Sequence, residues 1–305
     1  MSEITNVSDT ARWVATFRAR ESSRPDALFH DPFADRLAGK RGHAMTAQTP
    51  AIARNGWSFS ARTKLIDDLI VDCLDDGCDR VLNLAAGLDA RQYRLAVPEE
   101  LTWVEADLPA MIEEKQHTLA GEQPRCELIR RSVDLADATA RKRFLAEQLT
   151  DARRPLVITE GLLPYLTDDQ VRAISADLAE SGVHWWITDL MSPTDVRVSQ
   201  RVTRKQLAHT PIQFGPEEGV AFFALDGWTA VDTASVLKAA SRFKRLPWLL
   251  RPLGWLPEGK FGSTVVRLAR GTAIPRSGKP ETTLRRGPPW PWSHFGGRGG
   301  LDGTG

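Results

Sequence analysis

The sequence predicts an α/β fold built on a doubly wound, mostly parallel sheet. Short apolar segments alternate with amphipathic ones from residue 79 onward, about one pair for every 20 to 30 residues. Strands that alternate with helices of this length form parallel βαβ units. The predicted strands are residues 79–84, 101–106, 127–133, 155–159 and 184–189, and the predicted helices between them are 88–95, 109–120, 138–149 and 168–181.

The regular alternation of predicted strands and helices ends after Asp189. We expect a helix near 195–208, followed by an irregular stretch at 211–227. The segments "GWTAVDTA" and "FGSTVVRLAR" have the composition of two late strands that flank a helix at 233–243. These two strands bring the predicted sheet to seven.

The N-terminal third of the chain is predicted to be helical. The predicted helices are 8–22, with Ser8 or Asp9 as its cap, 31–39 and 61–77, with the last two ending at glycines. We therefore expect residues 1–78 to form a helical cap or lid that is part of the same domain as a core at 79–270. Within that core, residues 191–260 are interpreted as an insertion that serves as a substrate lid.

Residues 271–305 differ in composition from the rest of the chain. Nine glycines and five prolines occur among these 35 residues, and no apolar periodicity runs through them. Such a segment cannot repeat an apolar face, so a disordered tail is expected. A short recognition motif around Trp290 and Trp292 is the alternative.

Composition and charge exclude several classes of protein. The net charge of +1 predicts neither a nucleic-acid nor a membrane partner. The longest apolar run, "VAFFAL", is far shorter than a membrane span, and the N-terminus lacks the pattern of a signal peptide. Three cysteines without metal-ligand spacing and six unpaired histidines predict no metal site. A cytoplasmic protein is expected, and the Trp-rich stretches leave a homodimer open.

Polar residues recur at the predicted carboxyl ends of the strands. Gly87 follows the first strand, and acids follow the next four strands at separations of 20, 27, 26 and 29 residues; these are Asp107, Asp134, Glu160 and Asp189. Ligands of open α/β sheets bind across this edge. An acid about 20 residues after the first turn is where a ribose hydroxyl pair is recognised. The pattern therefore predicts an adenosine-containing ligand.

The first turn, "NLAAGLDA", indicates which adenosine ligand it is. A dinucleotide requires several glycines near its pyrophosphate, whereas this turn has Ala85 and Ala86 before Gly87. No P-loop motif occurs either. An acid-rich rim suits the cationic sulfonium and ammonium of S-adenosylmethionine and would repel a diphosphate. We therefore expect S-adenosyl-L-methionine as the cofactor.

Four ordered motifs carry a family resemblance: "NLAAGLDARQYRL", "VEADLP", "VDL" and "ITEGLLPYL". In order and spacing they resemble the S-adenosylmethionine-dependent methyltransferases of the leucine carboxyl methyltransferase family. The similarity is greatest to the bacterial branch described as polyketide O-methyltransferases. The resemblance covers about residues 8–270 and implies a seven-stranded class I methyltransferase sheet, which is Rossmann-like, and a role in secondary metabolism.

The resemblance also implies roles for individual residues. Ala85 and Gly87 would lie against the methionine portion of the cofactor, Asp107 would bind the ribose, and Asp134 with Leu135 would bind the adenine. Glu160 would face the cofactor's amino group or the substrate pocket. Arg62 matches an arginine that reaches a carboxylate of the cofactor or the substrate, and Arg18 could assist it.

Other interpretations of single residues stay open. Arg62 could instead pair with Asp67 or Asp68 on the surface, and Arg94 is expected to be structural, bound to Glu105. Asp89 is expected to cap the helix that starts near Ala90, and Asp189 could cap the segment that follows it. Tyr165 is either a packing residue or part of the acceptor pocket.

The predicted function is transfer of a methyl group to a carboxylate or hydroxyl of a small molecule. The catalytic candidates are Glu160, Arg62 and Tyr165. A carboxylate acceptor is already ionised near pH 7 and needs an orienting arginine, whereas an alcohol or phenol needs a base such as Glu160 or Asp189. The alternatives are a cofactor-binding protein without turnover and an NAD(P)-dependent oxidoreductase.

Overall fold

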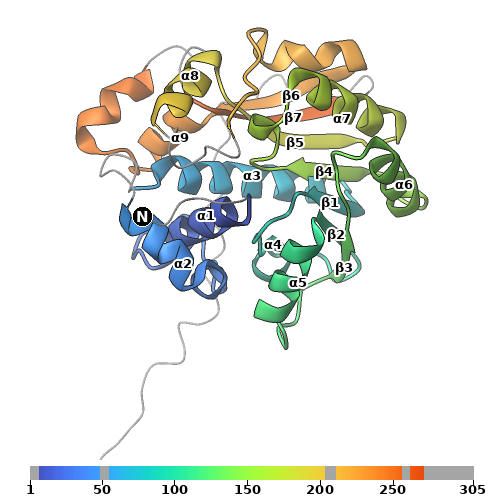
Figure 1. Ribbon diagram of the computed structural model, residues 1–305, viewed down its shortest axis with the longest axis horizontal. Helices are drawn as coiled ribbons and strands as arrows, with labels where there is room; N and C mark the ends of the chain where they lie inside the picture. Colours follow the sequence, from blue (N-terminus) through green and yellow to red (C-terminus); the bar gives the residue numbers. More distant parts are fainter. Residues whose placement is uncertain (1–6, 49–54, 203–210, 256–261, 271–305) are drawn as a thin grey trace, which may run out of the picture. The chain divides into compact units, whose positions relative to one another are not determined.

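Seven strands form one mixed sheet in the computed structural model, which describes residues 7–48, 55–202, 211–255 and 262–270. The strands are β1 (Arg80–Leu84), β2 (Thr102–Asp107), β3 (Glu127–Ser132), β4 (Pro155–Thr159), β5 (Trp185–Leu190), β6 (Trp228–Ser235) and β7 (Thr264–Arg270). Their order is β3-β2-β1-β4-β5-β7-β6, which Figure 1 shows from bottom to top. β7 runs antiparallel to both of its neighbours, and every other pair is parallel. The predicted seven-stranded, mostly parallel sheet is confirmed.

Helices cover both faces of this sheet. The α-helices are α1 (Val7–Ser22), α2 (Ala34–Gln48), α3 (Trp57–Asp75), α4 (Arg91–Arg94), α5 (Pro109–Thr118), α6 (Ala138–Leu149), α7 (Asp168–Glu180), α8 (Pro193–Val202) and α9 (Val236–Arg242). Three 3₁₀ segments are η1 (Leu163–Tyr165), η2 (Gly219–Asp226) and η3 (Trp248–Trp255).

Two predicted helix boundaries were wrong. Gly39 does not end the second helix, because its backbone (φ 56°, ψ −178°) makes a kink between two helical pieces that together reach Gln48. The helix expected at 88–95 is a single turn, α4. The predicted residues 203–208 and the tail at 271–305 lie outside the described residues.

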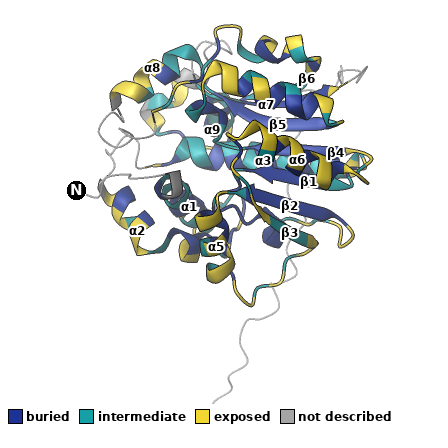
Figure 2. Ribbon diagram, turned by 45° about the vertical axis from the view of Figure 1, so that its right-hand side comes forward, coloured by how far each residue is buried: buried dark blue, intermediate teal, exposed yellow. Residues whose placement is uncertain are grey.

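The main core lies on the face of the sheet that α6, α7 and η2 cover. The five inner strands are buried over most of their length, whereas the edge strands β3 and β6 are mostly half-buried or exposed, and the flanking helices expose their outer faces (Figure 2). Trp186 of β5 is fully buried there, and its ring meets those of Phe223 and Trp228 edge to face. Its indole N–H donates to Oγ1 of Thr159 at 2.9 Å, so the polar atom of this large side chain is satisfied.

The first helix, α1, lies at the carboxyl edge of the sheet. α1 packs along α2 and touches the turn that follows β1, because a Cβ added at Gly87 would lie 3.3 Å from the Cβ of Ala11. Arg245, beyond α9, is bound by Glu21 of α1 through two short contacts, Nη2–Oε1 at 2.7 Å and Nε–Oε2 at 2.9 Å. The start and the late part of the chain therefore meet beside this edge, and all described residues belong to one compact unit, Met1–Pro275.

The turn after β1 has a left-handed backbone at two residues, Ala85 (φ 52°) and Gly87 (φ 46°). The left-handed conformation is accessible to glycine without cost but costs an alanine about 1–2 kcal/mol. The neighbouring Ala86 has no positive φ and is buried. Ala85 therefore carries backbone strain that the sequence "NLAAG" does not reveal.

We predict opposite effects for the same substitution at these two neighbours. Ala85→Gly relieves the strained φ, so the free energy of unfolding should stay level or rise by up to about 1 kcal/mol, because the added freedom of the unfolded chain offsets part of the gain. Ala86→Gly should lower it by about 1–2 kcal/mol, since it removes a buried methyl group and adds only unfolded-state entropy. Urea unfolding of both variants is the measurement. Equal decreases in the free energy of unfolding for the two variants would contradict backbone strain at Ala85.

Candidate active site

The site lies where the strand order reverses. β1 and β4 are neighbours in the sheet, but the chain leaves β1 toward β2 and returns to β4 only after β3. Such a switch point opens a crevice at the carboxyl ends of the strands, where α/β proteins bind their ligands. Gly87 follows β1 and Glu160 follows β4, so these two predicted site residues flank the switch point.

Asp107, the last residue of β2, holds the turn after β1 in place. Its Oδ2 accepts the N–H of Gly87 and its Oδ1 accepts the N–H of Leu108, both at 2.7 Å. Burial raises the pKa of this carboxyl, and the two N–H donors oppose that effect by binding the ionised form. The first of these bonds shows that Asp107 and the glycine turn lie together at the carboxyl edge, where the spacing of the strands predicts both.

Leu108 is a neighbour of Asp107 that the sequence analysis did not single out. Its side chain is 48% exposed, which is unusual for a large apolar residue directly after a buried strand. The only feature of the sequence that could have singled out Leu108 as a site residue is its position directly after the acid in "VEADLP".

Asp134 and Leu135 follow β3, one strand further from the switch point. The exposed Asp134 accepts the N–H of Ala136 through Oδ1 at 2.9 Å. Leu135 is buried in the main core, and its carbonyl accepts Nη1 of Arg141 at 2.6 Å. Because β3 pairs with β2 in register up to Asp107 and Ser132, the pair lies at the same edge as the predicted ribose-binding acid.

Arg62 of α3 reaches across to the ends of two strands. Its Nε donates to Oε1 of Glu160 at 3.0 Å, and its Nη1 donates to Oδ2 of Asp189 at 2.9 Å. The other oxygen of Asp189 accepts the N–H of Gly161 at 2.6 Å. The alternative that Arg62 pairs with Asp67 or Asp68 on the surface is therefore wrong, as is the idea that Asp189 caps the following segment.

A second arginine, Arg91, binds the other oxygen of Glu160. Its Nη1 lies 2.6 Å from Oε2 of Glu160 and 2.9 Å from Oδ2 of Asp89, and its Nε lies 2.7 Å from Oδ1 of Asp67. Asp89 also accepts the backbone N–H of Arg91 at 3.0 Å, so its predicted capping contact exists, although the residue preceding the helix is Ala90. Sequence reasoning missed Arg91, because its three partners are 24, 2 and 69 residues away.

Arg94 is structural as expected, but its predicted partner was wrong. Its Nη1 and Nη2 donate hydrogen bonds to the carboxylate of Asp67, at 2.7 and 2.8 Å. It makes no hydrogen bond to Glu105 among the described residues. Glu105 is fully buried and is bound by three other side chains, Lys115, Arg130 and Gln92. Arg18 is also structural. It donates hydrogen bonds to Asp31 at 2.8 Å and to the carbonyl of Leu88 at 2.5 Å.

These contacts decide the protonation of Glu160. Burial by itself would raise its pKa, but the charges of Arg91 and Arg62 outweigh burial and hold the pKa below its usual range. Burial also raises the pKa of Tyr165, at the end of η1, against the opposing effects of its hydrogen bond with Thr10 and of the charge of Arg62. At neutral pH the site therefore presents an ionised, doubly bound carboxylate and a protonated phenol, and neither is a ready base.

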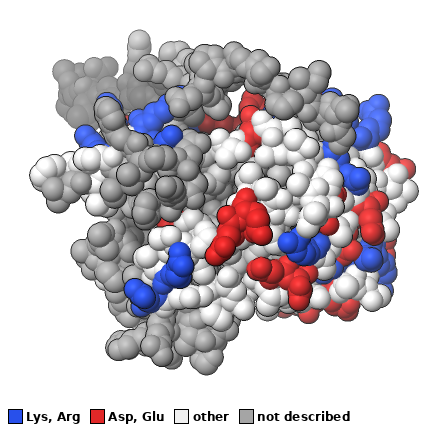
Figure 3. Space-filling model, turned by 90° about the horizontal axis from the view of Figure 1, so that it is seen from above, with Lys and Arg blue, Asp and Glu red and all other residues white. Residues whose placement is uncertain are grey.

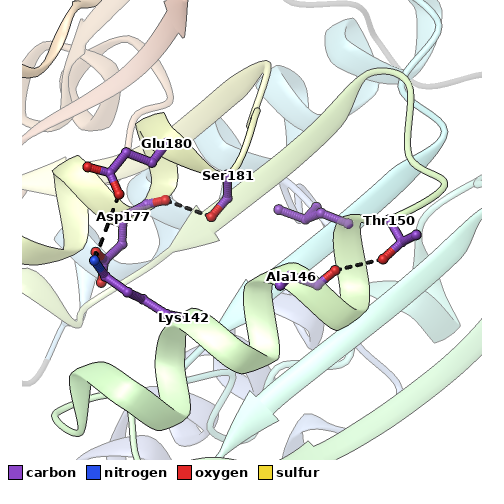
Figure 4. A pocket seen from close by; sticks show the side chains of 7 residues that line it. Lys142, Ala146, Thr150, Asp177, Glu180 and Ser181 are labelled. Carbon is purple, nitrogen blue, oxygen red and sulfur yellow. Dashed lines mark hydrogen bonds and ion pairs between the residues drawn. The ribbon is translucent and has the colours of Figure 1, made fainter.

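A cavity of about 350 Å³ lies elsewhere, between the C-terminal ends of α6 and α7 (Figure 4). Its polar side chains are engaged with each other or with their own helices: Lys142 lies 3.3 Å from Asp177, and Thr150 donates to the carbonyl of Ala146. Helices that follow parallel strands end at the opposite edge of the sheet, so this cavity is remote from the switch point.

Comparison with known proteins identifies the family and agrees with the fold. The profile of the leucine carboxyl methyltransferase family matches residues 11–179. A Streptomyces coelicolor protein named "Putative S-adenosyl-L-methionine-dependent methyltransferase" is 34% identical over 270 residues, or 83% of this chain and 91% of the relative. A protein of the same name from Mycolicibacterium paratuberculosis is 32% identical over 257 residues, or 75% and 85% of the two chains.

Two solved structures share the fold at 14% sequence identity. A DUF574 family protein from Streptomyces avermitilis has a TM-score of 0.57 and aligns over 86% of this chain and 97% of its own. A protein from Thermobifida fusca described as a "putative methyltransferase" has a TM-score of 0.55 and aligns over 85% of this chain and 94% of its own. The family match excludes the oxidoreductase alternative: the chain belongs to the leucine carboxyl methyltransferase family and is an S-adenosyl-L-methionine-dependent methyltransferase with a Rossmann-like sheet.

Proposed function

We propose that this enzyme methylates a carboxylate oxygen of a small molecule. The observation that carries the proposal is the state of Glu160, whose two oxygens are each taken by an arginine. A carboxylate bound in this way is a weak base, and an alcohol or phenol acceptor would need a strong one. A carboxylic acid is already ionised near pH 7 and needs only to be oriented.

Arg62 supplies the orientation. Its Nε and Nη1 bind Glu160 and Asp189, whereas its Nη2 makes no hydrogen bond within the residues that the structure describes. An arginine fixed on two sides presents its remaining N–H groups in a defined direction, which suits a planar carboxylate. Tyr165, with its raised pKa, contributes a hydrogen-bond donor to the same region.

The residues at the strand ends fit S-adenosylmethionine. The carboxylate of Asp107 would bind the ribose hydroxyls, and the turn at Ala85 and Gly87 would lie against the methionine portion. The exposed Leu108 and the Leu135 backbone would bracket the adenine, with Asp134 at its exocyclic amine. The acceptor-only character of these acids matches the hydroxyl and amine donors of the cofactor.

Glu160 would bind the cofactor's α-ammonium. When bound, S-adenosylmethionine supplies an electrophilic methyl group on a sulfonium, and transfer is an in-line displacement governed by alignment. The protein's contribution is then to hold the acceptor oxygen through Arg62 and the amino-acid end of the cofactor through Glu160. A hydroxyl acceptor is less well supported, because Asp189, the remaining carboxylate near Arg62, also has both oxygens engaged, by Arg62 and by the N–H of Gly161.

Charge and composition support a small acceptor in the cytoplasm. On the face shown in Figure 3 the basic side chains are scattered among acidic ones, with no continuous basic stripe on the part that is described. Among the described helices, none has the length and apolar character that a bilayer requires. Cys73, Cys78 and Cys126 are free, buried thiols, as in proteins of reducing compartments.

The ribose-binding role predicts that Asp107→Asn weakens S-adenosylmethionine binding at least tenfold, because an amide cannot accept from two backbone N–H groups and two hydroxyls together. Asp79→Asn is the matched control. Asp79 also bridges two backbone N–H groups, those of Arg153 and Arg154 at 2.9 Å, but before β1, at the other edge of the sheet. Titration calorimetry on the full chain with S-adenosylmethionine, S-adenosylhomocysteine and NAD(H) is the measurement. Equal affinities in the two variants would remove Asp107 from the cofactor site.

The carboxylate acceptor predicts a distinct pattern in an acceptor screen. Carboxylic acids should yield S-adenosylhomocysteine and base-labile methyl esters, whereas their alcohol and amide analogues should not. Arg62→Lys should raise KM for the acid at least tenfold, and by a larger factor than it raises the Kd of S-adenosylmethionine, since lysine keeps the charge beside Glu160 but lacks the planar fork. Turnover with alcohols or phenols alone would contradict the proposal. A loss confined to cofactor affinity would assign Arg62 to the cofactor's carboxylate.

A further inference from the structure

One buried guanidinium connects three elements beneath the proposed active site. Arg91 is 2% exposed and contacts three carboxylates: Asp67 on α3, Asp89 in the turn after β1, and Glu160 at the end of β4. Its Nη2 is buried without a hydrogen-bond partner among the described residues. The side chain is thus placed by its acidic partners even though one of its own donors stays unsatisfied.

Each oxygen of Glu160 has its own basic partner. Oε1 of Glu160 is bound by Arg62, and Oε2 is bound by Arg91 at 2.6 Å. Removal of Arg91 leaves Oε2 without its basic partner in a side chain that is only 14% exposed. A carboxylate in such surroundings gains a proton more readily and is free to rotate.

We propose that Arg91 is a positioning residue for the cofactor: it acts through Glu160, whose carboxylate it keeps charged and fixed toward the carboxyl edge of the sheet. Arg91 itself touches neither the cofactor nor the acceptor. The inference rests on the proposed role of Glu160 as the group that binds the α-ammonium.

Arg94 provides a matched control within the same helical turn. It is also buried and also binds Asp67, but it makes no contact with Glu160 in the described structure. Loss of either arginine leaves Asp67 with one partner instead of two, so both variants should lower stability. Only the Arg91 variant should change how cofactor affinity depends on pH.

The experiment compares Arg91→Gln, Arg91→Lys and Arg94→Gln in the full chain by calorimetric titration with S-adenosylmethionine between pH 5 and 8. In the unmodified protein the pKa of Glu160 lies below this window, so Glu160 should add no acidic limb to the affinity, and any limb that Asp107 adds should be the same in the Arg94→Gln control. In Arg91→Gln the pKa of Glu160 should rise. The affinity for S-adenosylmethionine should then fall as the pH falls, by up to about tenfold per pH unit below the new pKa. Arg91→Lys keeps a positive charge, so the pKa of Glu160 should rise less in this variant. It can be tested if Arg91→Gln does not fold.

A double-variant comparison separates this inference from its premise. If Glu160→Gln leaves S-adenosylmethionine affinity unchanged, the proposed role of Glu160 fails. If Glu160→Gln weakens binding but the Arg91 variants bind as Arg94→Gln does at every pH, only the inference about Arg91 is overturned. The expected result is that Arg91→Lys weakens binding at least fivefold in the normal background and has no further effect in Glu160→Gln, because both changes act on one carboxylate.

Discussion

The proposed active site depends on a series of alternating charges whose members are buried or partly buried. Asp189, Arg62, Glu160, Arg91 and Asp67 follow one another through direct contacts of 2.6 to 3.0 Å. These residues come from β5, α3 and the end of β4, with Arg91 in α4 and Asp67 again in α3. The series therefore fastens α3 to the carboxyl edge of the sheet. Buried ion pairs add little net stability, but the loss of one member is costly, at about 3–5 kcal/mol.

This arrangement separates binding from proton transfer. An acid at the end of β4 could in principle serve as a base, but one held between two guanidinium groups is an acceptor of hydrogen bonds only. The chemistry that remains is alignment of charged partners, which suits a nucleophile that is ionised before it binds. For the function that we propose, the arginines determine the class of acceptor as much as the acids do.

The sheet edge was predictable from sequence, whereas the ion series was not. Parallel strands end at one edge, so the spacing of Gly87, Asp107 and Glu160 was enough to place them together. Which cation meets which acid depends on the packing of α3 and α4 against the sheet, and no local pattern encodes it. For that reason the partner of Arg94 was predicted wrongly and Arg91 was overlooked. The strained φ of Ala85 was hidden in the same way, since an alanine gives no sign of a left-handed backbone.

Asp107 shows how such a fold prepares for its ligand. Because both of its oxygens already accept backbone N–H groups, the side chain has one orientation before any ligand arrives. Immobilising a free side chain on binding costs about 0.5–1.5 kcal/mol, and here that cost falls on folding instead. The ribose-recognition surface that we propose is thus rigid in advance, so a ligand's affinity there reports the complementarity of its hydroxyls and not the flexibility of the protein.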